Sequence, residues 1–363
     1  MKVPRKEFMK ALQLLYPAMG KGENNTSSNN YSFMTDDRGI SYAGATNNSV
    51  AVVLPLPFTL EQDFRVPGTL LYQLVKKLKA DELEIDLGVD CVFIKTNTPT
   101  QSIIQLQDKS KNMLDFLVEI PDTSFKPLPS NFTESLKECY PYCLNDNTSS
   151  IIKYVYAHKT SMCSANQSEI VMCDLTGEVD KMFISHKDAA ILTNFNLVGY
   201  AYQDSFLYFK TDDGAYIAVH PASQLERFPV VFDRDEYTDI ELINGMKDFT
   251  PEALFALDGM REIRFTDSEV KELKEVLDTC YLFDESDNSV SCMFDGDYVD
   301  ITITNSRGSH TGRINLSNYV SPFTMRTLPK LLEDIVNRKD LLYVGNGRVI
   351  VSNSKLKHLI QVK

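Results

Sequence analysis

The sequence predicts an α+β fold built from one repeated unit, in which an amphipathic helix lies on a small antiparallel sheet. Six amphipathic helical stretches recur along the 363 residues, and a run of short strands follows each of them. They begin near Pro4, Pro67, Ser130, Ser185, Asp267 and Leu328. Four of the five intervals are close to sixty residues, which is typical of a fold that repeats one supersecondary unit. Six copies predict a curved assembly that surrounds a ligand, with the helices on one face.

The composition is that of an ordinary globular chain. Apolar residues make up 43% and charged residues 24%. No apolar run approaches the eighteen or so residues of a membrane span, and the longest, at 50–58, is interrupted by two prolines. The charged N-terminus leads into an amphipathic helix, so no signal peptide is expected. Seven cysteines without CxxC or Cys/His spacing predict reduced thiols of a cytosolic protein.

The net charge of −13 argues against a broad basic surface for nucleic acid. The predicted helices nevertheless sum to +1, so the remaining residues carry −14. A near-neutral helical layer on an acidic body could hold DNA loosely while the outside of the protein repels it. Solvated helix faces with the usual mixture of signs explain the same charges equally well.

The first third of the chain predicts two helices and several strands. An amphipathic helix ends at Pro17, because proline lacks the backbone N–H. Residues 35–39, Thr-Asp-Asp-Arg-Gly, predict a hairpin turn. A second helix begins at Pro67. Strands are predicted at 82–87, 92–96 and 102–107.

The rest of the chain repeats this order. One helix ends at Pro141, and another begins with Ser185 as N-cap. Residues 212–214, Asp-Asp-Gly, predict a turn, and 221–266 predict a connector with a short helical piece at 251–257. The last helices are predicted at 268–280 and 328–338. Strands are predicted at 151–158, 163–173, 199–201, 206–210, 215–220, 290–294, 299–304, 312–316, 341–344, 348–351 and 356–363.

The sequence contains no recognisable catalytic constellation. The five histidines are scattered, and no GxSxG, Walker or GxGxxG motif occurs. Asp295-Gly296-Asp297, followed by Asp300, suggests a metal site but lacks the glycine and glutamate positions of a calcium loop. We interpret this segment as a hairpin turn. A metal-dependent nuclease, with an acidic site assembled from distant residues, stays an alternative.

The sharpest electrostatic feature is a group of three lysines on the second helix. Lys76, Lys77 and Lys79 occupy its polar face without one balancing acid. The group indicates either a helix face that contacts phosphates or a solvent-exposed helix face without a binding role.

Several short sequence segments, spread over the chain, occur in a characteristic order. Residues 64–78 combine a strand, a Val-Pro pair and a helix that ends in a basic pair. Residues 6–13 form an amphipathic helix, and 45–47 read Ala-Thr-Asn. Residues 122–127 and 225–229 place a phenylalanine just before a proline. In this order and spacing, the segments resemble the bacterial DNA polymerase III beta sliding clamp family over essentially the whole chain.

Two segments depart from the family pattern. Residues 165–171 lose the family's basic pair, and 358–363 replace its Met-Pro-Met-Arg-Leu type of ending. In the family these segments form a groove for partner peptides, so the resemblance implies a groove with altered sequence preference. Its residues would be Tyr154, Val155, Asn166, Ile170, Val171, Leu359, Ile360 and Val362. A diverged clamp of a bacteriophage or mobile element would fit these departures.

The resemblance implies a three-domain DNA clamp fold, with two helices packed on antiparallel sheets in each domain. The domains would be 1–126, 127–245 and 246–363. Two chains would close head to tail into a homodimeric ring, with the helices lining the hole. The implied function is that of a DNA sliding clamp, a processivity factor for a replicative polymerase. Neither a cofactor, a metal nor an enzymatic activity is expected.

The implied partners are double-stranded DNA, bound without sequence preference, a DNA polymerase and a clamp-loader ATPase. The protein would work in the cytoplasm of a bacterial or phage-infected cell, away from membranes. The residues expected to face DNA are Lys6, Lys10, Lys21, Lys76, Lys77, Lys79, Lys137, Lys187, Lys271, Lys274, Lys330 and Arg338. A monomeric clamp-like adaptor or decoy that binds a replication protein is the other alternative.

Overall fold

The computed structural model of the chain divides into two compact units. Unit 1 comprises Met1–Tyr140 and Leu175–Leu225, and unit 2 comprises Pro141–Asp174 and Glu226–Lys363. The structure describes residues 1–20, 29–47, 49–97, 101–107, 125–143, 151–166, 168–203, 206–220, 249–283, 289–306, 308–327, 329–330, 332–333, 341–345, 347–353 and 355–361.

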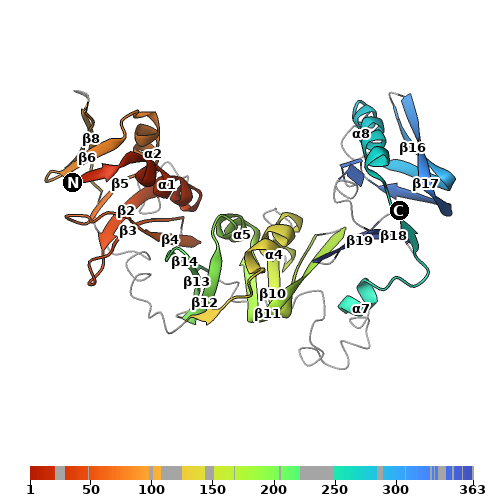
Figure 1. The fold of residues 1–363 in the computed structure, drawn as a ribbon, viewed down its shortest axis with the longest axis horizontal. Coiled ribbons are helices and arrows are strands. Elements are labelled where there is room, and N and C mark those ends of the chain that lie inside the picture. The colour runs from red at the N-terminus through yellow and green to blue at the C-terminus, as the bar shows by residue number, and fades with distance from the viewer. Residues whose placement is uncertain are drawn as a thin grey trace. The chain divides into compact units, whose positions relative to one another are not determined.

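The helices form where the sequence predicts them (Figure 1). The first two each follow a strand that ends in Val-Pro, and the fixed proline backbone starts the helix. The described helices are α1 (Arg5–Leu15), α2 (Gly68–Lys77), α4 (Phe132–Cys139), α5 (His186–Leu192), α7 (Pro251–Leu254) and α8 (Asp267–Tyr281). Pro329, Lys330, Leu332 and Glu333 are also helical. None of these helices has both the length and the apolar character that a membrane span requires.

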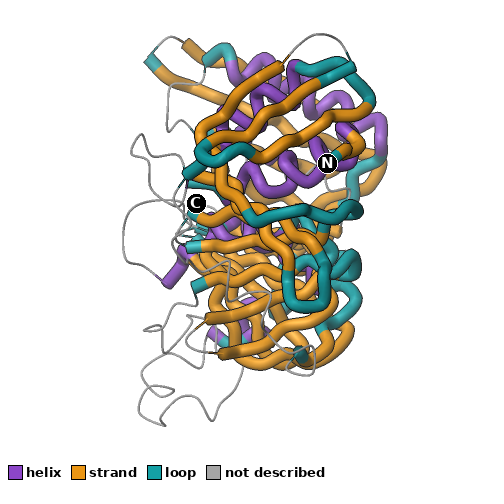
Figure 2. Tube along the Cα trace, turned by 90° about the vertical axis from the view of Figure 1, so that its left-hand side faces the viewer, coloured by secondary structure: helices purple, strands orange, loops and turns teal. Residues whose placement is uncertain are grey.

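Within unit 1 the helices pack in pairs, α1 against α2 and α4 against α5. Figure 2 shows the purple helices near the N-terminus lying against orange strands. Short 3₁₀ turns, η1 (Tyr16–Ala18), η4 (Tyr140–Tyr142) and η5 (Ile151–Lys153), flank the longer elements. One side of each long helix is therefore available for the core, and the other side carries polar residues.

The strands of the first half are β1 (Lys2–Pro4), β2 (Asn30–Thr35), β3 (Ser41–Thr46), β4 (Val50–Pro55), β5 (Phe64–Pro67), β6 (Glu82–Leu87), β7 (Cys91–Lys95), β8 (Gln101–Gln105), β9 (Lys126–Pro127) and β10 (Tyr154–Ala165). Those of the second half are β11 (Glu169–Ser185), β12 (Leu197–Gln203), β13 (Phe206–Thr211), β14 (Tyr216–Val219), β15 (Arg261–Ile263), β16 (Val290–Asn305), β17 (Gly308–Thr327), β18 (Leu341–Gly345), β19 (Arg348–Ser352) and β20 (Leu356–Gln361).

Three groups of four strands repeat one connectivity. Their orders are β1-β6-β7-β8, β9-β12-β13-β14 and β15-β18-β19-β20. In each group the first strand precedes a helix, and the other three follow the next helical segment. This four-stranded group therefore recurs three times, with two helical segments in each copy. Strands also follow each of the six helical segments that the sequence predicts.

Two of the three groups are extended by a strand from an earlier part of the chain. β14 pairs with β4, with Val219 opposite Val50, and β20 pairs with β11, with Leu359 opposite Ile170. Unit 1 consequently holds an eight-stranded sheet, and unit 2 holds a six-stranded sheet. β8 differs from β14 and β20, because it ends its sheet among the described strands. The three-domain division at 126 and 245 stays a prediction, since these sheets group the chain differently.

Matching asparagine turns precede both of the extending strands. The Oδ1 atom of Asn47 accepts hydrogen bonds from the backbone N–H groups of Ser49 and Val50, at 3.0 and 2.9 Å. Oδ1 of Asn166 accepts them from Ser168 and Glu169, at 2.9 and 3.0 Å. Such a side chain satisfies a tight turn that would otherwise leave backbone donors unpaired. The two turns therefore start β4 and β11 in the same way.

The hairpin turn predicted at Asp295-Gly296-Asp297 is wrong. This segment lies inside the continuous strand β16, and the register with β17 shifts on both sides of Gly296. Gly296 has φ +73°, a conformation that glycine adopts without the steric cost of a side chain. The Asp-Gly pair therefore forms a β-bulge, which the sequence pattern does not distinguish from a turn.

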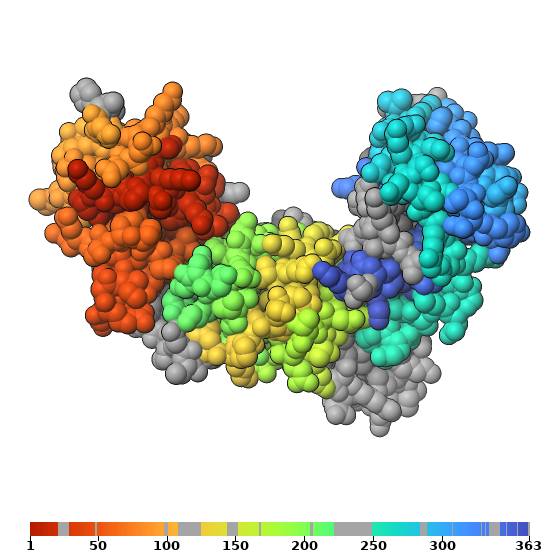
Figure 3. Space-filling model, in the orientation of Figure 1, coloured from red at the N-terminus to blue at the C-terminus, as the bar shows by residue number. Residues whose placement is uncertain are grey.

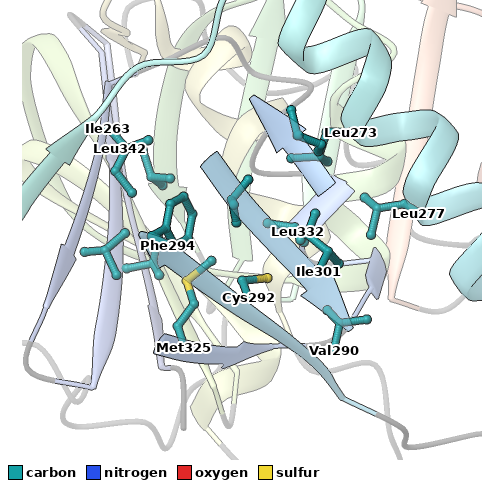
Figure 4. Close-up of a cluster of buried hydrophobic side chains, with 14 of the residues drawn as sticks. Ile263, Leu273, Leu277, Val290, Cys292, Phe294, Ile301, Met325, Leu332 and Leu342 are labelled. Carbon is teal, nitrogen blue, oxygen red and sulfur yellow. The ribbon is translucent and has the colours of Figure 1, made fainter. Parts of the chain in front are cut away.

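The core of unit 2 lies between α8, the β16–β17 hairpin and the outer strands of the six-stranded sheet. Figure 4 shows Leu273 and Leu277 of α8 directed toward this core, together with Ile301 and Phe294 of the hairpin. Leu342 of β18 lies at its other side. A helix-to-sheet core of this kind leaves the opposite side of α8 to polar residues.

A buried carboxylate lies at the junction of β4 and β14. Asp188 at the start of α5 is 3% exposed, and the Ser49 hydroxyl donates to its Oδ1 atom at 3.2 Å. The backbone N–H of His220, just after β14, donates to the carbonyl of Ser49. Burial raises the pKa of Asp188 to about 6, against the opposing effects of the Ser185 and Ser49 hydroxyls, His220 and Lys187.

Replacing Asp188 with Asn should therefore remove a pH dependence of stability. The folded-state pKa lies above the usual 3.8. The folded protein thus binds more protons, and its stability falls as the pH rises from about 4 to about 6. The full shift corresponds to about 3 kcal/mol. Urea unfolding followed by circular dichroism, at about pH 4 and about pH 7.5, measures the difference.

Asp188→Asn keeps the oxygen that accepts from Ser49 and should show little difference between the two pH values from this site. Asp37→Asn, at an exposed position of the β2–β3 turn, is the matched control. If both variants keep the wild-type pH dependence, the assignment to Asp188 is wrong.

Candidate DNA interface and partner-peptide site

The lysines of α1 and α2 point outward because the apolar side chains of these helices fill the core of unit 1. Lys6 and Lys10 lie one turn apart on α1, and Lys76 and Lys77 end α2; all four are exposed. Figure 3 shows the deep red segment of α1 at the surface of unit 1. The buried apolar side chains of the two helices are Phe8, Met9, Ala11, Leu12, Leu15, Leu71 and Val75.

The residues predicted to face DNA are exposed wherever the structure describes them. They are Lys6, Lys10, Lys76, Lys77, Lys79, Lys137, Lys187, Lys271, Lys274 and Lys330. Lys21 and Arg338 lie outside the described residues. Exposure is what a phosphate contact requires, and the contact itself stays a prediction.

Acids do not neutralise the basic side chains of α1 and α2. Within the described part of the chain, none of the four lysines on these helices forms an ion pair. The Lys76 Nζ atom lies 5.8 Å from the ring centroid of Tyr72, a contact that leaves its charge unpaired. The guanidinium of Arg5 donates to the carbonyls of Val75 and Lys76, at 3.0 and 3.1 Å, and so holds the start of α1 against the end of α2.

The charge is distributed unevenly over the helices. α1 and α2 together carry five basic side chains and one acid, a net charge of +4. α8 carries five acids and only Lys271 and Lys274, a net charge of −3. α4 has a net charge of −1, and α5 is neutral apart from His186. Among the described helices, the attraction for a polyanion is therefore concentrated on α1 and α2.

The residues predicted for the partner-peptide site lie on three neighbouring strands of unit 2. β10, β11 and β20 are adjacent in the six-stranded sheet. Tyr154 and Val155 begin β10, and Asn166 lies in the turn that leads to β11. Val362 lies outside the described residues. Peptide binding at these strands stays a prediction.

The strand register divides these residues between two faces of the sheet. Ile170 of β11 is directly opposite Leu359 of β20, so both point to one face. Val171 and Ile360 alternate with them and point to the other face, where Ile360 joins the core of unit 2. Only Ile170 in this group is more than slightly exposed. Of these four residues, Ile170 is therefore the one that a peptide could reach, with the largely buried Leu359 beside it.

A hydrogen-bonding contact lies on the core-facing side of the same strands. His358 is 1% exposed, and its Nε2 atom lies 3.1 Å from Oε1 of Glu169. The Asn166 amide donates to Oε2 of Glu169 at 2.8 Å, and the Tyr142 ring packs edge-on against His358 at 4.6 Å. These four residues hold the turn before β11 against β20. Sequence reasoning missed this contact, because 189 residues separate the partners and no motif links them.

Two of the acidic residues near Gly296, Asp295 and Asp300, have protein partners. The Tyr298 hydroxyl donates to Asp295 at 2.9 Å, and the Arg313 guanidinium makes two hydrogen bonds of 2.6 Å to Asp300. That guanidinium holds the pKa of Asp300 below its usual range. Among the described residues, no group of three or more His, Cys, Asp or Glu side chains could hold a metal ion. The metal-dependent nuclease hypothesis gains no support from this segment.

No protein-family model and no curated protein sequence matches the chain. Solved structures do match it along its whole length. A DnaN sliding clamp from Bartonella birtlesii covers 100% of this chain and 98% of its own, with a TM-score of 0.78 at 12% identity. The DNA polymerase III beta subunit from Thermotoga maritima covers the same shares, with a TM-score of 0.76 at 14% identity.

The chain has the fold of the bacterial DNA polymerase III beta sliding clamp. The α+β clamp fold expected from the sequence segments is thus confirmed. A third clamp, from Helicobacter pylori, has a TM-score of 0.76 at 10% identity and covers 100% of this chain and 99% of its own. That protein is bound to a DNA ligase peptide, and the Bartonella birtlesii clamp is bound to griselimycin.

Replacing Lys76, Lys77 and Lys79 together with Ala should weaken the binding of duplex DNA to this clamp-fold chain. Each lost phosphate contact should reduce the dependence of log K on log salt by about 0.9, so the slope should fall by up to about three. Fluorescence anisotropy at several salt concentrations measures this slope.

Lys271→Ala with Lys274→Ala on α8 is the comparison variant. Because five acids surround these two lysines on α8, the change in slope per lysine should be smaller. An equal change per lysine would contradict the concentration of attraction on α1 and α2.

Proposed function

We propose that this chain is a DNA sliding clamp, a processivity factor that encircles duplex DNA and tethers a replicative polymerase. It would act without enzymatic activity of its own. The likeness to solved clamps supports a clamp-like role. The main observation in favour of a ring is that β8 is an edge strand among the described strands.

β8 is the counterpart of β14 and β20, since each is the last strand of its four-stranded group. β14 and β20 are paired on their outer sides by β4 and β11, whereas β8 ends its sheet among the described strands. Ile103 on β8 is 58% exposed. A free strand edge that exposes an apolar side chain is suited to pairing with another chain.

The matching free edge would be supplied by the β16–β17 hairpin of a second copy. This hairpin occupies the place in the last repeat that β4 and β11 occupy in the earlier ones, and no other described strand extends it. Pairing β8 of one chain with the hairpin of another uses each edge once. A head-to-tail contact of this kind closes into a ring when the rotation that relates neighbouring chains adds up to a full turn. Two chains of three four-stranded groups each would give a ring of six such groups.

Retention on DNA would then depend on topology and not on affinity. DNA threaded through a closed ring cannot leave sideways, while water-bridged lysine contacts slide along the phosphates with little barrier. The lysines would attract phosphate without reading bases. The overall charge of −13 fits this role, because the acidic remainder of the surface would repel DNA from the outside.

We further infer that a DNA polymerase docks through a short peptide at β10, β11 and β20. The partly exposed Ile170, which lies directly opposite Leu359, supports this site. An ATP-driven clamp loader would open the ring. The protein would work in the cytoplasm of a bacterial or phage-infected cell.

A monomeric clamp-like adaptor or decoy that binds a replication protein is the second candidate. The net charge of −3 on α8 favours it, since that charge is unfavourable for a helix that lines a DNA channel. Native mass spectrometry at micromolar concentration separates the two: a dimer supports the clamp, and a monomer supports the adaptor.

The loaded protein should stay on nicked circular DNA and be lost when the circle is linearised. A closed ring can leave only over a DNA end, so linearisation should release it without any change in salt. Gel filtration of the protein–DNA mixture, before and after cutting with a restriction enzyme, measures retention. Equal retention on circular and linear DNA would refute topological linkage.

Ile103→Lys should convert the dimer to a monomer, because it places a charge on the β8 edge that would pair with the second copy. Sedimentation velocity measures the change in mass. Val89→Lys is the matched control, since Val89 is also an exposed apolar residue but lies in the turn between β6 and β7. A dimer that tolerates both substitutions equally would exclude the β8 edge from the contact.

A further inference from the structure

Two tyrosine rings form a stacked pair at the surface between α1 and α2. Tyr16, at the end of α1, and Tyr72, on α2, have ring centroids 4.4 Å apart and planes inclined by 29°. Tyr16 is 36% exposed. The apolar side of α1 is already buried through other residues, so the core does not account for a large ring at the surface.

The two rings restrict each other by stacking, and a buried tyrosine anchors the last turn of α1. Tyr31 is fully buried, and its hydroxyl donates to the carbonyl of Leu12 in the last turn of α1 at 3.0 Å. Burial raises the pKa of Tyr31, and electrostatic interactions with Tyr16 and Tyr72 add to the rise. A ring held in this way loses little conformational entropy when a ligand stacks on it.

One unpaired positive charge lies beside the tyrosine pair, and others lie on the same two helices. Lys76 lies over the Tyr72 ring, and Lys77 and Lys10 are exposed on the same two helices, whose net charge is +4. An aromatic platform beside a cationic surface is the combination that binds single-stranded nucleic acid, because bases stack on the rings while phosphates meet the lysines. Bases within a duplex are already stacked on one another and cannot use the rings.

We propose that the face of α1 and α2 binds single-stranded DNA, with an unpaired base stacked on the Tyr16–Tyr72 pair. Lys10, Lys76 and Lys77 contact the phosphates on either side of that base. The proposal rests on the proposed function only in that DNA reaches this helical face. It gives the face a second ligand, the unpaired strand beside a primer end, in addition to the duplex.

The test uses the full-length protein and a single-stranded oligonucleotide that carries 2-aminopurine, whose fluorescence falls when the base stacks on an aromatic ring. Wild-type protein should quench the probe. Tyr16→Leu, which keeps an apolar side chain but removes the ring, should weaken binding by roughly 5- to 150-fold and abolish the quenching. Tyr16→Phe keeps the ring and should bind and quench like the wild type.

Tyr319→Leu is the matched control, because Tyr319 is a 76% exposed tyrosine on β17, an element of unit 2, whereas α1 and α2 belong to unit 1. It should bind and quench like the wild type.

Circular dichroism verifies that the variants are folded, and Tyr72→Leu provides an independent removal of the pair if Tyr16→Leu fails to fold. A duplex of the same length, measured in parallel, should bind Tyr16→Leu and wild type equally.

Equal losses for Tyr16→Leu and Tyr16→Phe would overturn the proposal, since they would indicate a role of the hydroxyl and not of stacking. Equal weakening of single-stranded and duplex DNA by Tyr16→Leu would also overturn it. Failure of retention on circular DNA, with quenching intact, would refute the clamp and leave this proposal standing. If the protein stays on circular DNA but Tyr16→Leu quenches the probe as well as the wild type does, the stacking proposal would be refuted and the clamp would stand.

Discussion

Antiparallel pairing between strands that are distant in sequence is the interaction on which this fold depends. β4 is buried from Val50 to Val53 and lies between β3 and β14, so a strand from an early part of the chain completes a sheet of a later part. β11 does the same for β20. Backbone hydrogen bonds carry this pairing and require only that the side chains be apolar and alternate correctly. This explains how chains that are only 10–14% identical share one fold.

The polar residues divide the helices and strands into surfaces of different character. The net charge of +4 on α1 and α2 stands against −13 for the whole chain, so these two are the described helices most attractive to a polyanion. On β11 and β20 the buried His358 and the partly buried Glu169 occupy the core-facing side, while Ile170 and Leu359 lie on the other. A contact that holds two strands in register can thus lie directly behind a partly exposed apolar residue, Ile170.

Local signals in the sequence predict much of this fold, and non-local contacts account for what they miss. Val-Pro before α1 and α2 predicts both helix starts, and Thr35–Gly39 predicts the first hairpin, because a few neighbouring residues decide these structures. Asp295-Gly296-Asp297 fails as a turn, because the same residues form a bulge when a long partner strand is available. The lysines of the candidate DNA face are predicted by their spacing. The contact of Glu169 with His358, and the stacking of Tyr16 on Tyr72, depend on tertiary packing that no spacing reveals.

The strand junctions within one chain have a consequence for the opening of a two-chain ring. β4 meets β14 through four residue pairs and β11 meets β20 through five, and both junctions are tethered by continuous backbone. If two paired strands of one chain separate, the linker between them keeps their effective concentration high, so they pair again readily. Strands on different chains have no such linker. β8 offers a similar length of five residues without that advantage. The gap through which DNA enters would therefore form where β8 meets the second chain.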